Sequence, residues 1–410
     1  MVDVGFPRAR CRPKRRYLAL MDRSSLLGHN KTAGADCHIS AFPKNPNGAS
    51  LDRLKPASSM RQFRMNAFRC ALTLLAGLAV LAFVRVEKVR AEEARQPLAI
   101  ELSFDRPLEA SMAPFVVAER RGLFAAERLS VTNNFADGSP GAIARVASGA
   151  SEFALVDLNE LIRYRDRADA QPIKAVFVLF NKAPYAIVAR KSRSIRALSD
   201  VVGKTLGVAD GDLSFRLWPA LARQNGIRPD SVKVYRMSAA VREPILSAGQ
   251  VDAVAGFSYL SAVNLRDRGV PANDLAVLRY ADYGCEAYGF AIVVNPTFAL
   301  AKPDAVKGFV RAVIAGTHHA IKDPQRAVDE VVSLMDGASR ELELERLRTV
   351  ITDNILTGEV KRHGLGGIDP ARLERSIDQI AEDYKFRKRP TADEVFDGGF
   401  LPPVGGRLIN

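Results

Sequence analysis

The stretch DGSPGAIARVASGASEFALVD, residues 137–157, joins a helix to a buried strand and decides the fold class. Apolar residues recur at helical spacing over Gly141–Ser148, Gly149 ends that helix, and Phe153–Val156 then forms a strand. A weak repeat of the same helix, glycine, acidic residue and strand follows as ILSAGQVDAVAGF, residues 245–257. Two copies of one helix–strand unit predict two α/β lobes.

Short strands and helices alternate on both sides of these units. We expect a helix over Ala113–Arg121, ended by Gly122, and strands over Leu98–Phe104, Leu129–Phe135, Ala175–Phe180, Tyr185–Arg190, Thr205–Ala209, Val232–Tyr235, Ala253–Phe257, Ala276–Tyr280 and Phe290–Val294. This alternation predicts βαβ units with parallel pairing. After Pro296 the pattern indicates only helices, over Pro303–Lys322, Pro324–Met335, Arg340–Asn354 and Pro370–Tyr384. The helical tail must pack back on one of the sheets.

Two α/β units joined by strands, with helices completing the first, are the architecture of a type II periplasmic binding protein. We expect two doubly wound sheets joined by crossover strands near Tyr185–Lys191 and Tyr288–Val294, with the C-terminal helices on lobe 1. Lobe 1 would comprise residues 97–186 and 291–403, and lobe 2 residues 187–290. A single doubly wound enzyme domain is the alternative. It should carry a nucleotide-binding fingerprint, and neither G-x-G-x-x-G after a strand nor G-x-x-x-x-G-K-[ST] occurs.

An apolar run, ALTLLAGLAVLAFV at residues 71–84, predicts export. Three arginines precede it, and Val89-Arg90-Ala91 follows with small residues at the two positions that a signal peptidase reads. The run is shorter than the roughly 20 apolar residues of a membrane span. We expect a signal peptide over 60–91 and a mature periplasmic protein that starts near Glu92. A retained N-terminal anchor is the alternative.

The net charge of +13 lies almost wholly in the leader. Residues 1–91 hold 17 of the 59 Lys and Arg and 5 of the 46 Asp and Glu, which leaves 42 basic against 41 acidic residues. The mature part is therefore nearly neutral, which argues against a nucleic-acid partner.

Residues 1–59 show no helical or strand period. They are either an extension upstream of a translation start at Met60 or Met65, or a disordered basic arm. Only Cys285 follows the leader, so we expect no internal disulfide, and we expect Cys285 to be a packed or semi-exposed thiol and not a nucleophile.

Two loops carry residues suited to hold a small ligand. Asp137–Gly141 and Val208–Ser214 each follow a strand and open a helix, whose N-terminus offers free N–H groups. Each alone is also explained as an ordinary capped turn, whereas two facing each other would grip one ligand. A third segment, Tyr283–Gly289, lies by position at the hinge, where its aromatic rings could stack on a planar ligand.

The chain resembles the family of substrate-binding proteins for nitrate, sulfonate, taurine and thiamine-precursor importers, the SsuA/THI5-like proteins. The pieces that carry this resemblance, in the family's order, are APFVVAERRGLFAAERL, the opening stretch 137–157, SIRALSDVVGKTLGV, ILSAGQVDAVAGF, DYGCEAYGFAIVV and FDGGFLPP. The resemblance implies a receptor, expected as a monomer, that closes two lobes on a small solute and delivers it to an ABC permease in the inner membrane.

The resemblance also extends to an enzyme, the thiamine-pyrimidine synthase. That enzyme is recognised by a lysine that holds pyridoxal phosphate, a nearby histidine and a cysteine-rich iron-binding run. In this sequence these features would fall on Val156, near Glu160 and on Tyr283–Phe290, where only Cys285 remains. We therefore predict no enzymatic activity, no cofactor and no metal. The histidines of the helical tail are expected at the surface or in packing: His318, His319 and His363.

Eight side chains at strand ends and loops are the candidate ligand contacts: Asp105, Ser139, Asp157, Ser214, Arg216, Phe257, Tyr283 and Glu286. Arg216 could pair an anionic group bidentately. Four carboxylates are expected near the ligand: Asp105, Asp157, Asp212 and Glu286. They suit a ligand that carries amino or ring N–H groups, such as a pyrimidine. Two solute classes stay open: a sulfonate- or taurine-like anion and a thiamine-pyrimidine-like heterocycle.

Overall fold

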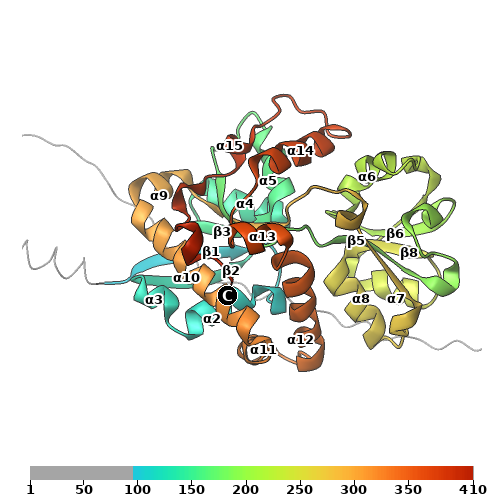
Figure 1. Cartoon of the computed structure of the whole chain (residues 1–410), viewed down its shortest axis with the longest axis horizontal. Coiled ribbons are helices and arrows are strands. Elements are labelled where there is room, and N and C mark those ends of the chain that lie inside the picture. The colour runs from blue at the N-terminus through green and yellow to red at the C-terminus, as the bar shows by residue number, and fades with distance from the viewer. Residues whose placement is uncertain (1–95, 410) are drawn as a thin grey trace, which may run out of the picture. The chain divides into compact units, whose positions relative to one another are not determined.

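Two mixed sheets of five strands each organise the chain in a computed structural model that describes residues 96–409. The first sheet has the order β2-β1-β3-β10-β4, with bounds Leu129–Phe135, Leu98–Phe104, Phe153–Asp157, Phe290–Val294 and Lys174–Val178. The second has the order β7-β6-β8-β5-β9, with bounds Lys233–Met237, Thr205–Ala209, Ala253–Phe257, Tyr185–Arg190 and Leu275–Arg279. Figure 1 shows both, and the predicted fold class is confirmed.

Pairing directions in the two sheets match strand for strand. β1 pairs in parallel with β2 and β3, and β6 pairs in parallel with β7 and β8. The two crossover strands, β10 and β5, are antiparallel to both of their neighbours. The expectation of parallel pairing is therefore right for three strands of each sheet and wrong for the crossings. A crossover strand enters its sheet from the opposite end, because the chain reaches it from the other lobe.

Helices cover the first sheet and pack tightly on one another. They are α2 (Ala113–Arg120), α3 (Leu123–Ala126), α4 (Gly138–Ser148), α5 (Leu158–Arg165), α9 (Pro296–Ala301) and α10 (Pro303–Lys322). A Cβ on Gly316 of α10 would lie only 2.1 Å from the backbone oxygen of Pro114 on α2, so no side chain fits at this crossing. In the core below, the rings of Phe153 and Phe309 stack with their centroids 4.0 Å apart.

The second sheet carries α6 (Trp218–Gln224), α7 (Arg242–Ser247) and α8 (Ser258–Asp267) (Figure 1). The C-terminal tail comprises α11 (Pro324–Val332), α12 (Arg340–Thr349), α13 (Gly358–His363), α14 (Pro370–Ala381) and α15 (Ala392–Val395). As predicted, the tail packs on the first lobe, where α11 contacts α2 and α15 contacts α5. The tail also contacts helices of the second sheet, because Arg346 of α12 donates to the side-chain oxygen of Asn264 on α8 at 2.5 Å.

All the described residues belong to one unit of the chain. Within residues 96–409, no helix combines the length and the apolar character needed to cross a membrane. The predicted signal peptide over 60–91 and the segment 1–59 lie outside the described residues.

Candidate functional site

A cavity of about 430 Å³ lies where strands of both sheets end. Its wall is formed by residues 105–106 after β1, 137–140 after β2, 209–213 after β6 and 256–257 at the end of β8, together with Arg216, Ala239, Arg242 and Leu260. The carboxyl ends of parallel strands are where ligands bind in open α/β sheets. The two loops singled out in the sequence thus face one cavity, one from each sheet.

Arg106 is a cation of the first-sheet wall that no pattern in the sequence indicated. Its Nε and Nη2 donate to the two carboxylate oxygens of Asp105 at 2.9 and 3.0 Å. The guanidinium lies 4.0 Å from the ring centroid of Phe290 and 4.9 Å from that of Phe257. Burial opposes the charge, but Asp105, Tyr259 and Glu109 outweigh burial and raise the pKa of Arg106. Arg106 is therefore a fixed, already paired cation.

Ser139 connects Asp105 to Asp157 below the cavity wall. Its hydroxyl donates to Asp105 Oδ2 at 2.6 Å and accepts from the backbone N–H of Asp157 at 3.0 Å. Ser139 is only 1% exposed, and both bonding directions of its hydroxyl are in use within the protein. Ser139 therefore positions Asp105, although it also contributes to the cavity wall.

Asp157 lies deeper than the cavity and is fully buried. It caps α5 by accepting from the backbone N–H of Asn159 at 2.8 Å, and it accepts a second bond from the Tyr185 hydroxyl. Burial raises the pKa of Asp157 to about 6, against the opposing effect of the Tyr185 hydrogen bond. Because Asp157 ends β3 and Tyr185 begins β5, this contact joins the two sheets.

Cations on the second-sheet wall are also paired. Arg216, after β6, donates through Nη1 to both oxygens of Glu160 on α5 at 2.7 Å. Arg242 forms ion pairs with Asp212 at 3.2 Å and with Glu243 at 2.7 Å. Ser214 is fully buried beside this group and donates to Asp212, so it does not line the cavity. Every arginine of the wall thus has a carboxylate partner within the protein.

Two carboxylates of the wall differ from the others. Asp137 and Asp210 are exposed, and each is the first residue of an Asp-Gly pair that follows β2 or β6. Within residues 96–409, neither carboxylate forms an ion pair or a side-chain hydrogen bond. Each can therefore accept hydrogen bonds from a ligand, one from each side of the cavity. Phe257 adds a half-buried aromatic surface, which itself stacks on Tyr259.

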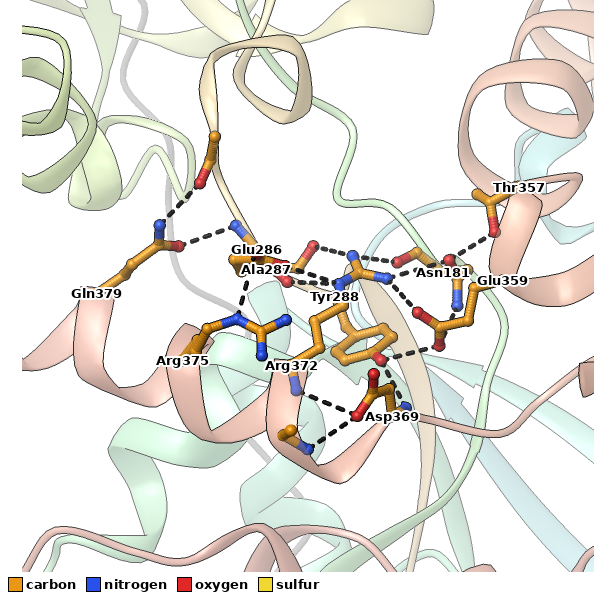
Figure 2. A network of polar contacts seen from close by, with 12 residues as sticks. Asn181, Glu286, Ala287, Tyr288, Thr357, Glu359, Asp369, Arg372, Arg375 and Gln379 are labelled. Atoms are coloured by element: carbon orange, nitrogen blue, oxygen red, sulfur yellow. Dashed lines mark hydrogen bonds and ion pairs between the residues drawn. The ribbon is translucent and has the colours of Figure 1, made fainter.

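Tyr283 and Glu286 do not line this cavity. Glu286 instead faces α14, where its carboxylate lies 3.5 Å from Arg372 and 3.4 Å from Arg375, as Figure 2 shows. Tyr283 ends a short 3₁₀ helix, and its carbonyl accepts from Asn225 at 3.0 Å. The ring that stacks in this segment is Tyr288, and its partner is the Arg372 guanidinium at 4.0 Å, not a ligand.

The positions that correspond to the lysine, the histidine and the cysteine run of the pyrimidine synthase have no catalytic partners in this structure among residues 96–409. Val156 is buried within β3, and Glu160 is the partner of Arg216. Burial raises the pKa of the Cys285 thiol to about 11, so it stays protonated and a poor nucleophile near neutral pH. Among residues 96–409, no cluster of three or more His, Cys, Asp or Glu is arranged to hold a metal ion.

Comparison with known proteins gives matches of several kinds. A family model described as NMT1/THI5 like matches residues 109–327. Riboflavin-binding protein RibY of Chloroflexus aurantiacus is 26% identical over 302 residues, which are 71% of this chain and 82% of that protein. A 4-amino-5-hydroxymethyl-2-methylpyrimidine phosphate synthase of Legionella pneumophila is 24% identical over 217 residues, 53% of this chain and 67% of that enzyme.

Solved structures of binding proteins share the fold. The periplasmic aliphatic sulphonate binding protein SsuA of Escherichia coli superimposes with a TM-score of 0.60 at 13% identity, covering 74% of this chain and 92% of that one. The periplasmic nitrate-binding protein NrtA of Synechocystis PCC 6803 gives a TM-score of 0.56 at 10% identity, covering 75% and 87%. At these identities the likeness concerns the fold alone.

Proposed function

The chain belongs to the NMT1/THI5-like family, and we propose that it is the solute-binding component of an ABC importer. The observation that carries the proposal is the cavity between the strand ends of the two sheets, with residues 137–140 on one side and 209–213 on the other. A receptor that holds its solute between two lobes needs contacts from both. The binding proteins that share this fold support the same role.

The charges of the cavity favour a neutral or cationic heterocycle over a simple anion. Nitrate or a sulfonate needs cations that are free to pair, and Arg106, Arg216 and Arg242 each already have a carboxylate partner. Among the described residues of the cavity wall, the carboxylates without an ion-pair partner are the acceptors Asp137 and Asp210. We propose a solute with ring or amino N–H groups that stacks on Phe257. The names of two relatives, which refer to riboflavin and to an aminopyrimidine, support this class.

An enzyme like the pyrimidine synthases is the second candidate, because several relatives carry that name. We propose that this chain is not such an enzyme. Val156 cannot form a Schiff base, and one protonated thiol at Cys285 cannot replace a cysteine cluster.

We propose export to the periplasm through residues 60–91, a monomer there, and delivery to an inner-membrane permease. Lobe 1 would comprise residues 97–186 and 291–403, and lobe 2 residues 187–290. Solute binding would select the closed state, and the permease would detect that state.

A thermal-shift screen followed by small-angle scattering tests the function. Riboflavin, aminopyrimidines, nitrate and aliphatic sulfonates are the compounds to screen. A bound solute at 100 times its Kd should add about 2.7 kcal/mol to the free energy of unfolding. The same solute should reduce the radius of gyration as the lobes close. Chemical turnover of a screened compound without any compaction would favour the enzyme instead.

Asp210→Asn and Asp137→Asn should each weaken binding of an N–H-bearing solute. The amide oxygen of Asn still accepts, but a hydrogen bond to a neutral acceptor contributes about 1 kcal/mol less than one to a charged acceptor, which is about five- to tenfold in Kd. The free energy of unfolding should stay unchanged, since both carboxylates are exposed and unpaired. Calorimetric titration measures the effect, and Asp230→Asn is the matched control, an exposed carboxylate outside the cavity wall. Unaltered affinity in both variants would remove the two aspartates from the ligand site.

A further inference from the structure

A second cavity, of about 270 Å³, adjoins the first and has the opposite balance of charge. The two cavities share Pro140 and Arg216 in their walls, so they lie next to each other at these residues. Three arginines line this second cavity and only one carboxylate does: Arg163, Arg167, Arg216 and Glu160. We call it the arginine cavity.

Glu160 cannot neutralise the arginines around it. Both of its oxygens accept from Arg216 at 2.7 Å. Arg163 is left with a 3.6 Å contact to the same carboxylate, and its buried Nε has no hydrogen-bond partner among the described residues. Arg167 lies at the rim, where its exposed side chain pairs with Asp169 at 2.8 Å. The positive charge of Arg163 therefore remains largely uncompensated.

Arg163 is nonetheless held in place. Its guanidinium lies 5.1 Å from the ring centroid of Tyr384, and only 13% of its side chain is exposed. Tyr384 is fixed in turn by its hydroxyl, which donates to Asp166 at 3.2 Å. An immobilised guanidinium with unused donors, at the wall of a cavity, is suited to bind an oxyanion in a fixed geometry.

We propose that the arginine cavity binds a phosphate ester carried by the solute whose ring lies in the first cavity. The inference rests on the proposed function, because it takes the first cavity as the site of the ring. A phosphorylated heterocycle would satisfy both observations together: its N–H groups meet Asp137 and Asp210, and its phosphate meets Arg163 with Arg216 beside it. A solute without an anionic group would leave Arg163 uncompensated.

Matched ligand pairs and matched variants test the proposal on the full-length chain. The pairs are riboflavin with riboflavin 5′-phosphate, and 4-amino-5-hydroxymethyl-2-methylpyrimidine with its phosphate, with inorganic phosphate titrated alone. The variants are Arg163→Gln and, as control, Arg165→Gln, which removes the same charge from the same helix outside either cavity wall. Arg163→Lys keeps the charge, and thermal unfolding verifies that each variant folds.

We expect Arg163→Gln to weaken binding of a phosphorylated compound, or of phosphate alone, by at least about tenfold. Binding of the unphosphorylated partner should not change, Arg165→Gln should behave like the unaltered chain, and Arg163→Lys should recover part of the affinity. Equal affinities in the Arg163→Gln and Arg165→Gln variants for every anion titrated, phosphate included, would overturn the proposal. If the unphosphorylated heterocycles bind but Arg163→Gln changes no affinity, the phosphate site is contradicted and the receptor function is not. If phosphate binds through Arg163 but no heterocycle binds and the lobes do not close, the receptor function is contradicted and the phosphate site is not.

Discussion

Arg372→Met should lower the free energy of unfolding by about 3–5 kcal/mol, the range for removing one partner of a buried ion pair. Only 12% of the Arg372 side chain is exposed. Its Nη1 donates to Glu359 at 2.9 Å, its Nη2 to the carbonyl of Asn181 at 2.8 Å, and its Nε to the carbonyl of Glu286 at 3.0 Å. Figure 2 shows these bonds converging on one guanidinium.

The position of Arg372 in the fold explains why the loss should be large. Asn181 belongs to the connection from β4 to β5, and Glu286 to the connection that leads into β10. One side chain of α14 therefore holds both passages of the chain between the sheets. Without it, Glu359 keeps its bonds from Asn181 at 3.0 Å and from the Tyr288 hydroxyl at 2.9 Å, but its charge is left without a cation.

Arg375→Met is the matched control, since Arg375 lies three residues further along α14 and also faces Glu286. Its side chain is 54% exposed, so the exposed pair should contribute only about 0–1 kcal/mol. Denaturation with urea or guanidinium chloride measures both variants. Similar losses in the two would mean that burial and convergence at Arg372 have no special weight.

Local patterns were enough to predict most strands, because branched apolar runs with turn residues at both ends determine them. The bounds of β1, β2, β5, β6, β8 and β10 match the expected ranges. β4 was predicted to reach Phe180 but ends at Val178, where the N–H groups of Leu179 and Phe180 both donate to the carbonyl of Phe290 and the ladder stops. That ending depends on a partner strand far along the chain. The helix predicted over Arg340–Asn354 likewise changes to a π-helix at Val350.

The cavity wall could be predicted from the sequence only where a single loop contains the residues that indicate it. The Asp-Gly turns after β2 and β6 are local, so the sequence located both loops. The sequence did not indicate Arg106, because apart from the adjacent Asp105 the groups that hold it, Tyr259 and Phe290, come from distant elements. The contacts of Glu286 with Arg372 and Arg375 are also invisible to local patterns, because both arginines lie in a helix more than 80 residues later.

The buried carboxyl of Asp157 should make the protein lose stability as the pH rises from about 4 to above 6. Burial raises its pKa in the folded state from 3.8 to about 6. The folded protein therefore binds this proton more tightly than the unfolded chain does. The resulting stabilisation is fully present below pH 3.8 and is lost as the pH rises through 6. A shift of about two pKa units corresponds to roughly 3 kcal/mol.

Asp157→Asn should remove this pH dependence, because the amide stays neutral and its oxygen can still accept from the backbone N–H of Asn159. Relative to the unaltered chain, the variant should gain stability as the pH rises from about 4 through 6 and keep that gain at higher pH, by up to about 3 kcal/mol less the cost of the altered bond to Tyr185. Urea denaturation at several pH values measures the difference. Asp274→Asn is the control: the hydrogen bond from Arg190 lowers the pKa of Asp274 below 3.8, so the stabilisation by this carboxylate is fully present above pH 3.8 and is lost only at lower pH. The difference between this variant and the unaltered chain should therefore stay constant between pH 4 and 8. Parallel curves for the unaltered chain and Asp157→Asn would show that Asp157 titrates as it does in the unfolded chain.

Tyr185→Phe tests the cause of the pKa shift of Asp157. The Tyr185 hydroxyl lowers the pKa of Asp157, so its removal should move the loss of stability to higher pH.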